Sequence, residues 1–163
     1  MALHHQIIAA AVIERNGRFL LIEERVDNQL RLNQPAGRLE AHESPAEGAV
    51  RECMEESGYS FLPTHLVGIY AYHDPRSDAL YLRLAYTGAL FIPHAEPLQP
   101  QDPGIHAVHW MTREEVEAHQ PRHRSPLVLR SIEDYSRGVR YRLDVVSTLG
   151  AGTNGRFVEE VTR

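Results

Sequence analysis

A single helical segment constrains the fold more than any other part of this chain. Ser44 is a good N-cap residue, Pro45 suits the first helical position, and Glu47 completes a capping box with Ser44. Gly58 stands where helices commonly end in a left-handed residue. Between these caps an apolar stripe recurs at helical spacing, formed by Ala46, Ala49, Val50 and Cys53. The segment therefore predicts an amphipathic helix with one buried face.

The elements around this helix predict a mixed α+β fold. Residues 5–13 are rich in Ile, Val and Ala and predict a strand buried on both faces, and Asn16-Gly17 predicts a hairpin turn after it. Thr112 caps a short helix, and a last helix runs from Ser125 or Pro126 to its stop at Gly138. Further strands are predicted at 18–23, 30–34, 66–72, 79–86 and 106–111. This order favours an α/β/α sandwich around a mixed sheet.

Three carboxylates share one face of the predicted central helix. Glu52, Glu55 and Glu56 stand at i, i+3 and i+4, opposite the apolar stripe. Like charges held this close cost folding energy unless a cation neutralises them. Mg²⁺ prefers such hard oxygen ligands and can bridge them to phosphate oxygens. Taken alone, however, three glutamates at this spacing are more often a solvated surface, so their context has to decide.

The context is a spaced motif over residues 37–59. Gly37 is followed after five residues by Glu43, and after seven more by Arg51-Glu52-Cys53-Met54-Glu55-Glu56-Ser57-Gly58-Tyr59. This pattern resembles the Nudix box, the signature of the Nudix hydrolase family. The resemblance implies a Nudix fold with a mixed, curved β-sheet between helices, over a domain of residues 4–146. We expect residues 147–163, with three glycines and few apolar residues, to form a flexible tail.

The resemblance also implies roles for single residues. It implies a bound Mg²⁺, which Mn²⁺ can replace, held by Glu52, Glu55, Glu56 and the backbone carbonyl of Ala36. Arg51 and Glu43 match a pair that holds the box loop against the helix, and they join Glu55 and Glu56 in the expected catalytic set. Either Glu55 or Glu56 can serve as general base. Asp102 is a lesser alternative for that base, because an Asp beside a proline is more often a turn residue.

Outside the box, residues 5–145 are similar to the NudJ-type phosphatases. The similarity rests on residues 33–37, 39–41 and 124–128, and on positions between 131 and 141. It implies release of orthophosphate from nucleoside tri- or diphosphates, or from thiamine-pathway pyrimidine diphosphates. Leu32 stands where such enzymes are expected to carry an aromatic residue, which leaves the preference for an organic ring open.

Two residues outside the box are expected to contact the substrate. Gln34 directly precedes the box loop, although capping a strand end is an equal alternative for it. Arg124, with Arg122 and His123, can form a cationic cluster for phosphate. A solvated basic surface is the alternative for that cluster. His73 and Arg76, in a predicted turn, are weaker indications of a phosphate contact.

Composition limits the partners of the protein. The formal net charge is -5 and every one of the 17 basic residues is Arg. A negative protein without a basic stripe is not expected to bind nucleic acid, whereas a small phosphorylated substrate needs only a local cationic pocket. No apolar run is long enough to span a membrane, and the single Cys53 fits a reducing cytoplasm. A monomer and a homodimer are both compatible with the sequence.

Two other functions compete with the NudJ-type interpretation. One is a Nudix pyrophosphohydrolase acting on damaged nucleotides or dinucleoside polyphosphates, with RNA 5′ ends least favoured because a basic stripe is missing. The other is a non-catalytic module that senses a nucleotide. Such a module is expected to have lost glutamates of the box, and here all of them are present.

Overall fold

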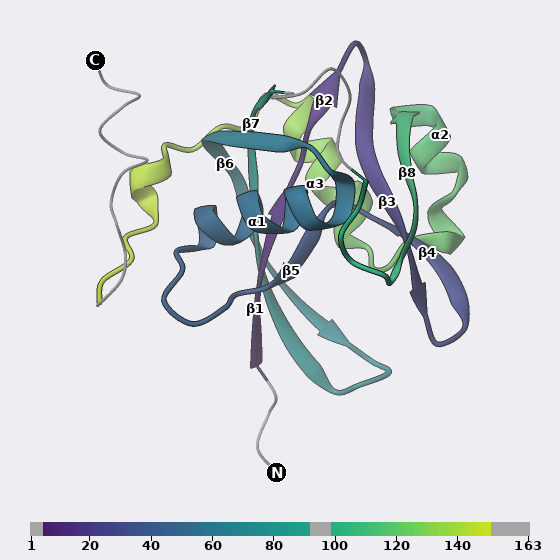
Figure 1. Cartoon of the computed structure of the whole chain (residues 1–163), viewed down its shortest axis with the longest axis horizontal. Helices are drawn as coiled ribbons and strands as arrows, with labels where there is room; N and C mark the ends of the chain where they lie inside the picture. Colours follow the sequence, from purple (N-terminus) through teal and green to yellow (C-terminus); the bar gives the residue numbers. More distant parts are fainter. Residues whose placement is uncertain (1–4, 92–98, 151–163) are drawn as a thin grey trace.

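The computed structural model of the protein describes residues 5–91 and 99–150. Within these ranges the helices are α1 (Pro45–Ser57), α2 (Arg113–Ala118) and α3 (Leu127–Ser136), with short 3₁₀ turns at Gln120–Arg122 and Leu143–Val145 (Figure 1). The strands are β1 (His5–Ala11), β2 (Glu14–Arg15), β3 (Arg18–Val26), β4 (Gln29–Asn33), β5 (Ala36–Arg38), β6 (Ser60–Asp74), β7 (Ala79–Phe91) and β8 (Ile105–Thr112).

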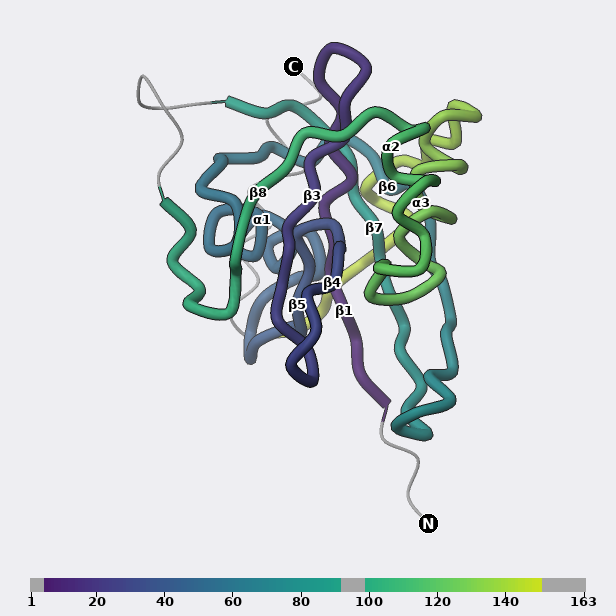
Figure 2. The backbone as a smooth tube through the Cα atoms, turned by 90° about the vertical axis from the view of Figure 1, so that its right-hand side faces the viewer, coloured from purple at the N-terminus to yellow at the C-terminus, as the bar shows by residue number. Residues whose placement is uncertain are grey.

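The strands of the described chain form two sheets. The first has the order β5-β1-β7-β6, in which β1 and β7 are parallel and the other neighbours are antiparallel. In the second sheet, β3 pairs antiparallel with β2, β4 and β8. Figure 2 shows α1 on one side of the strands and α2 and α3 on the other. The predicted α+β sandwich with a mixed sheet is confirmed, although hydrogen bonding divides its strands between two sheets.

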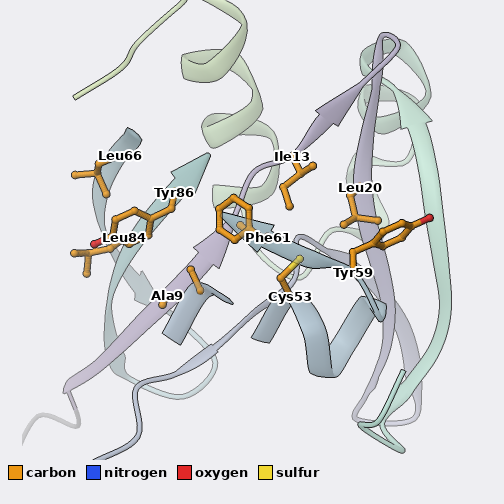
Figure 3. Packing of buried hydrophobic residues seen from close by; sticks show 11 residues of the cluster. Ala9, Ile13, Leu20, Cys53, Tyr59, Phe61, Leu66, Leu84 and Tyr86 are labelled. Atoms are coloured by element: carbon orange, nitrogen blue, oxygen red, sulfur yellow. The ribbon is translucent and has the colours of Figure 1, made fainter. Parts of the chain in front are cut away.

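Alternating side chains of β1 and β3 build two separate cores. Ala9 and Leu20 pack in a cluster with Cys53 of α1, whereas Ala10 and Leu21 pack in a cluster with Ile132 of α3. Figure 3 shows the first of these cores around Cys53. Because successive strand residues point to opposite faces, one apolar run can serve both helical layers. This explains why these segments are nearly continuously hydrophobic.

Burial on both faces holds only for part of the first predicted strand. From Ala9 to Ile13 every residue is buried, but Ile7 is 46% exposed. The chain also leaves the first sheet after Ala11, so the Asn16-Gly17 turn connects β2 with β3 instead of closing a hairpin on β1. Both turn residues have positive φ angles, 53° and 76°, as this tight turn requires.

The predicted strands at 66–72 and 79–86 are longer in the structure. β6 and β7 pair over almost their whole length, and shifts in register occur near Pro63 and between Leu66 and Gly68. Such bulges allow a proline inside a strand without ending the pairing. The sequence rules stop a strand at proline, which is why the predicted start of β6 was too late.

α1 follows its predicted bounds closely. The Ser44 side chain accepts from the Glu47 N–H at 3.3 Å, and Glu47 accepts from the Ser44 N–H at 2.7 Å. Gly58 closes the helix in a left-handed conformation with φ 74°. The helix therefore starts and ends at set positions, which determines where its glutamates lie.

Replacing Ser44 with alanine is expected to lower the free energy of unfolding by about 1 kcal/mol, because the N–H of Glu47 loses its acceptor. Urea denaturation followed by circular dichroism measures this change. Ser147→Ala, at an exposed position after the 3₁₀ turn at Leu143–Val145, serves as the matched control and should leave the midpoint almost unchanged. An equal loss in both variants would contradict the capping role.

Two sequence predictions fall partly outside the described residues. The sequence also predicts a Pro-rich loop over about residues 92–103, of which residues 92–98 are outside the described ranges, as are residues 151–163 of the predicted tail. The domain limits at 4 and 146 stay a prediction. Among the helices of the described residues, none combines the length and the apolar character needed to cross a bilayer.

Candidate active site

The site begins where α1 lies against the edge strand β5. Gly37 pairs with Ala9 of β1, so the backbone groups of Ala36 and Arg38 face the free edge of the sheet. Glu56 is only 5% exposed, and its Oε2 accepts from the Ala36 N–H at 2.8 Å. The carbonyl of a strand residue faces the same side as its N–H. The Ala36 carbonyl therefore shares this edge with Glu56.

Glu52 lies over the backbone of Gly37. A Cβ atom at position 37 would fall 2.0 Å from Glu52 Oε1 and 2.2 Å from its Cδ. No real pair of atoms approaches that closely, so a side chain at this position would displace the carboxylate. The glycine is thus needed to let Glu52 reach the strand edge.

Arg51 joins the loop before the helix to the helix itself. It donates to Glu43 through Nε at 3.0 Å and through Nη2 at 2.7 Å, and Nη2 also donates to the Arg38 carbonyl at 2.9 Å. Burial acts against ionisation of Glu43, but the hydrogen bonds from Arg51 and from the Glu40 N–H hold its pKa below the usual value. The structure therefore contains the Arg51–Glu43 pair as a two-pronged, charge-assisted contact.

The other two box glutamates also contact Arg51. Its Nη1 donates to Glu52 Oε1 at 2.7 Å and to Glu55 Oε2 at 3.2 Å. The Glu55 side chain is 39% exposed, whereas Glu52 and Glu56 are buried. The acidic cluster thus has one side open to solvent and one side closed by β5.

Burial leaves this cluster short of positive charge. Desolvation raises the pKa of Glu56 to about 9 against the opposing hydrogen bond from Ala36, and Glu52, Glu24 and Asp102 add to the rise. Desolvation likewise raises the pKa of Glu52, although Arg51 opposes it. A cation placed among these oxygens would relieve both effects.

The donor set suits a hard divalent cation, although the side chains do not converge on one point. Within the described residues, no three His, Cys, Asp or Glu side chains lie close enough together to hold a metal ion as they stand. The reason is that Glu52 and Glu55 both turn toward Arg51. Carboxylate oxygens beside the backbone of Ala36 are nevertheless the ligand type that Mg²⁺ takes. The donor chemistry of Glu52, Glu55 and Glu56 therefore fits such an ion, and joint binding requires Glu52 and Glu55 to turn from Arg51.

A cavity of about 190 Å³ adjoins the strand edge. Ala36 and Gly37 line it on the side of the box, and Glu24 and Asn33 line it from the second sheet. The rest of its wall is formed by Gln6, Ile8, Arg38, Tyr72, Asp74, Tyr81, Arg83, Arg124, Ser125 and Leu127. The cavity thus combines two cations outside the box, Arg83 and Arg124, with two carboxylates, two tyrosines and two side-chain amides.

Of the two predicted substrate contacts, Arg124 lines this cavity and Gln34 does not. Gln34 is 1% exposed; its amide donates to the Val128 carbonyl at 2.8 Å and accepts from Arg83 Nη2 at 2.7 Å. Both of its polar atoms are therefore used inside the protein. In this structure Gln34 orients Arg83, and its direct contact with substrate stays a prediction.

The other residues predicted to contact phosphate have separate partners within the protein. Arg122 pairs with Glu23, and His123 turns inward to the Val116 carbonyl at 2.9 Å, so they do not form a cluster with Arg124. Asp102 is exposed and accepts from the Gly104 N–H at 2.7 Å, as a turn residue does. Arg76 pairs with Asp74 inside its own turn.

Arg83 is the residue of the cavity that sequence reasoning missed. It lies in an apolar stretch, between Leu82 and Leu84, that reads as an ordinary buried strand. A signal was present, because Tyr81 and Arg83 are two residues apart and so share one face. The sequence does not show that this polar face lines the cavity, because that depends on the pairing of β7 with β1.

Comparisons with known proteins agree with this geometry. The NUDIX domain model matches residues 3–129. Phosphatase NudJ of Escherichia coli K12 is 36% identical over 140 residues, covering 86% of this chain and 89% of that protein, and NudJ of Shigella flexneri matches equally. A NUDIX hydrolase structure from Nitrosomonas europaea has a TM-score of 0.83 at 39% identity, covering 88% of this chain and 97% of that one. The chain therefore belongs to the Nudix family of hydrolases, which act on phosphoanhydride bonds.

Proposed function

We propose that the protein uses Mg²⁺ to hydrolyse the phosphoanhydride bond of nucleoside tri- or diphosphates, or of thiamine-pathway pyrimidine diphosphates, and releases orthophosphate. One observation carries the proposal: two buried carboxylates meet the backbone of β5 beside a cavity that three arginines line. Carboxylates suit the cation and guanidinium groups suit phosphate oxygens. The similarity to a protein named Phosphatase NudJ supports phosphate as the released product.

The roles of the box residues follow from their positions. Glu52, Glu55, Glu56 and the Ala36 carbonyl would hold Mg²⁺ or, as a substitute, Mn²⁺. When bound, such a cation polarises water and phosphate oxygens and offsets charge that develops on them. Arg51 and Glu43 keep the loop and the helix at a constant separation, which positions Glu52 over Gly37.

Proton transfer requires a base that can exchange with solvent. Glu55 is the most exposed of the three glutamates, so it can take a proton from the attacking water and release it to bulk solvent. Glu56 is enclosed and bonded to Ala36, which suits a ligand better than a base. Arg124, on the wall of the cavity, would contact phosphate oxygens of the substrate.

A panel of substrates tests the proposal. The protein is incubated with Mg²⁺ and nucleoside triphosphates, nucleoside diphosphates, sugar nucleotides and thiamine-pathway diphosphates, and the released fragments are identified. Orthophosphate from several compounds, abolished by EDTA and restored by Mg²⁺, is the expected result. Release of pyrophosphate with a monophosphate would instead favour a Nudix pyrophosphohydrolase of damaged nucleotides or dinucleoside polyphosphates. In the proposed function the protein acts in the cytoplasm, as a monomer or a homodimer.

A further inference from the structure

Arg83 is a buried cation held only by neutral groups. It is 4% exposed, and its Nη1 and Nη2 donate to the Asn33 side-chain oxygen at 3.2 Å and to the Gln34 side-chain oxygen at 2.7 Å. Among the described residues, no carboxylate lies within 4.0 Å of its guanidinium nitrogens, although the ion pairs of other arginines are numerous. The protein therefore buries this charge without a direct counter-charge.

Such an arrangement is expensive for the fold alone. Burial lowers the pKa of Arg83 to about 10, and only more distant groups, first Tyr70 and then Glu24 and Glu56, act in the other direction. Its Nε has no hydrogen-bond partner among the described protein atoms. Buried charges and buried donors are normally paired, so an exception calls for an explanation by function.

The position of Arg83 supplies that explanation. Its neighbour Leu84 packs in the core with Cys53 of α1, so Arg83 points to the opposite face of the sheet. There it lines the same cavity as Ala36 and Gly37. These two residues belong to β5, the strand that contacts the box glutamates. Arg124 lines this cavity too, but it already has a partner in Glu24 at 3.6 Å.

We propose that Arg83 is a phosphate-binding residue, which takes oxygens of the substrate's diphosphate group through the Nη–H groups that Asn33 and Gln34 leave unused. Asn33 and Gln34 hold the planar guanidinium in place from one side, so little freedom is lost when an anion arrives on the other. This inference rests on the proposed function and deepens it, because it names the residue that recognises phosphate away from the box.

Two variants of the full chain test the role of Arg83. Arg83→Met removes all donors, and Arg83→Gln keeps a polar group that can bond to Asn33 and Gln34. Arg113→Met is the matched control, since Arg113 is exposed on α2 and pairs with Glu117 of the same helix. Binding of methylenediphosphonate, a diphosphate analogue that cannot be cleaved, is measured by calorimetry in EDTA and separately in Mg²⁺.

Both Arg83 variants are expected to bind the analogue at least about tenfold more weakly than wild type, whereas Arg113→Met binds normally. For an active substrate, KM should rise by a similar factor and kcat should change less. A purely structural arginine would instead lower the melting temperature and leave the affinity of the folded variants unchanged, which would overturn the proposal. So would a wild type that binds the analogue in neither buffer.

The same variants show whether Arg83 contacts the phosphate or the organic group of the substrate. If they keep the affinity for methylenediphosphonate but lose it for a nucleoside diphosphate, Arg83 contacts the organic group and the phosphate assignment is wrong. Failure of the proposed hydrolysis is a distinct result, because the binding in EDTA depends neither on the cation nor on turnover. A protein that binds the analogue through Arg83 yet hydrolyses nothing would retain this inference and lose the function.

Discussion

Replacing Glu56 with glutamine is expected to lower kcat by about three orders of magnitude, the effect of losing several kcal/mol of charge stabilisation at the metal site. The fold should survive, because glutamine has the same shape and its amide oxygen can still accept from the Ala36 N–H. The carboxylate is almost fully enclosed, so the metal-free protein gains nothing from its charge. The melting temperature in EDTA should therefore stay at or above that of wild type.

Thermal melts with and without Mg²⁺ separate catalysis from metal binding in this variant. At a cation concentration about 100-fold above its Kd, wild type should gain about 2.7 kcal/mol, and the variant should gain far less. Glu117→Gln is the control, because Glu117 is an exposed glutamate on α2 outside the site. It should keep both turnover and the response to Mg²⁺. A wild-type rate for Glu56→Gln at saturating Mg²⁺ would show that the metal site is assigned to the wrong residues.

The sequence was most informative where local chemistry and spacing act together. The capping box and Gly58 placed α1 correctly, and the resemblance to the Nudix box implied the Arg51–Glu43 pair that the structure contains. These features depend on contacts between residues close in the chain. The helix bounds can be read from one sequence because the geometry of a helix and its caps is constant.

Long-range contacts explain what the sequence could not provide. β5 was missed because Pro35-Ala36-Gly37 reads as a break, yet an edge strand needs few ladder bonds, and the Pro35 carbonyl still accepts from the Ala11 N–H at 2.9 Å. Gln34 was expected to face the substrate because nothing local shows that Val128 and Arg83 occupy its amide. The place of Arg83 in the cavity depends on the pairing of β7 with β1, which the sequence does not show.

Gly37→Ala is the second variant expected to have a large effect on turnover and a small effect on the fold. The new Cβ would overlap the Glu52 carboxylate, and the three nearest atoms all belong to the end of that flexible side chain. Glu52 can therefore swing away at little cost to stability, but it then leaves the edge of β5. We expect kcat to fall by about 100-fold, corresponding to about 2.7 kcal/mol, while the melting temperature changes by only a few degrees.

Gly17→Ala is the control for Gly37→Ala, because it is expected to lower stability and leave kcat unchanged. Gly17 lies in a hairpin turn with φ 76°, and a Cβ added there would meet none of the described atoms within 4 Å, so alanine is strained without touching the site. That variant should lose about 1 kcal/mol of stability and keep its kcat. Activity assays and urea denaturation on both proteins would then give opposite profiles. If Gly37→Ala kept full activity, Glu52 would have no need of the strand edge, and its role as a ligand beside Ala36 would be refuted.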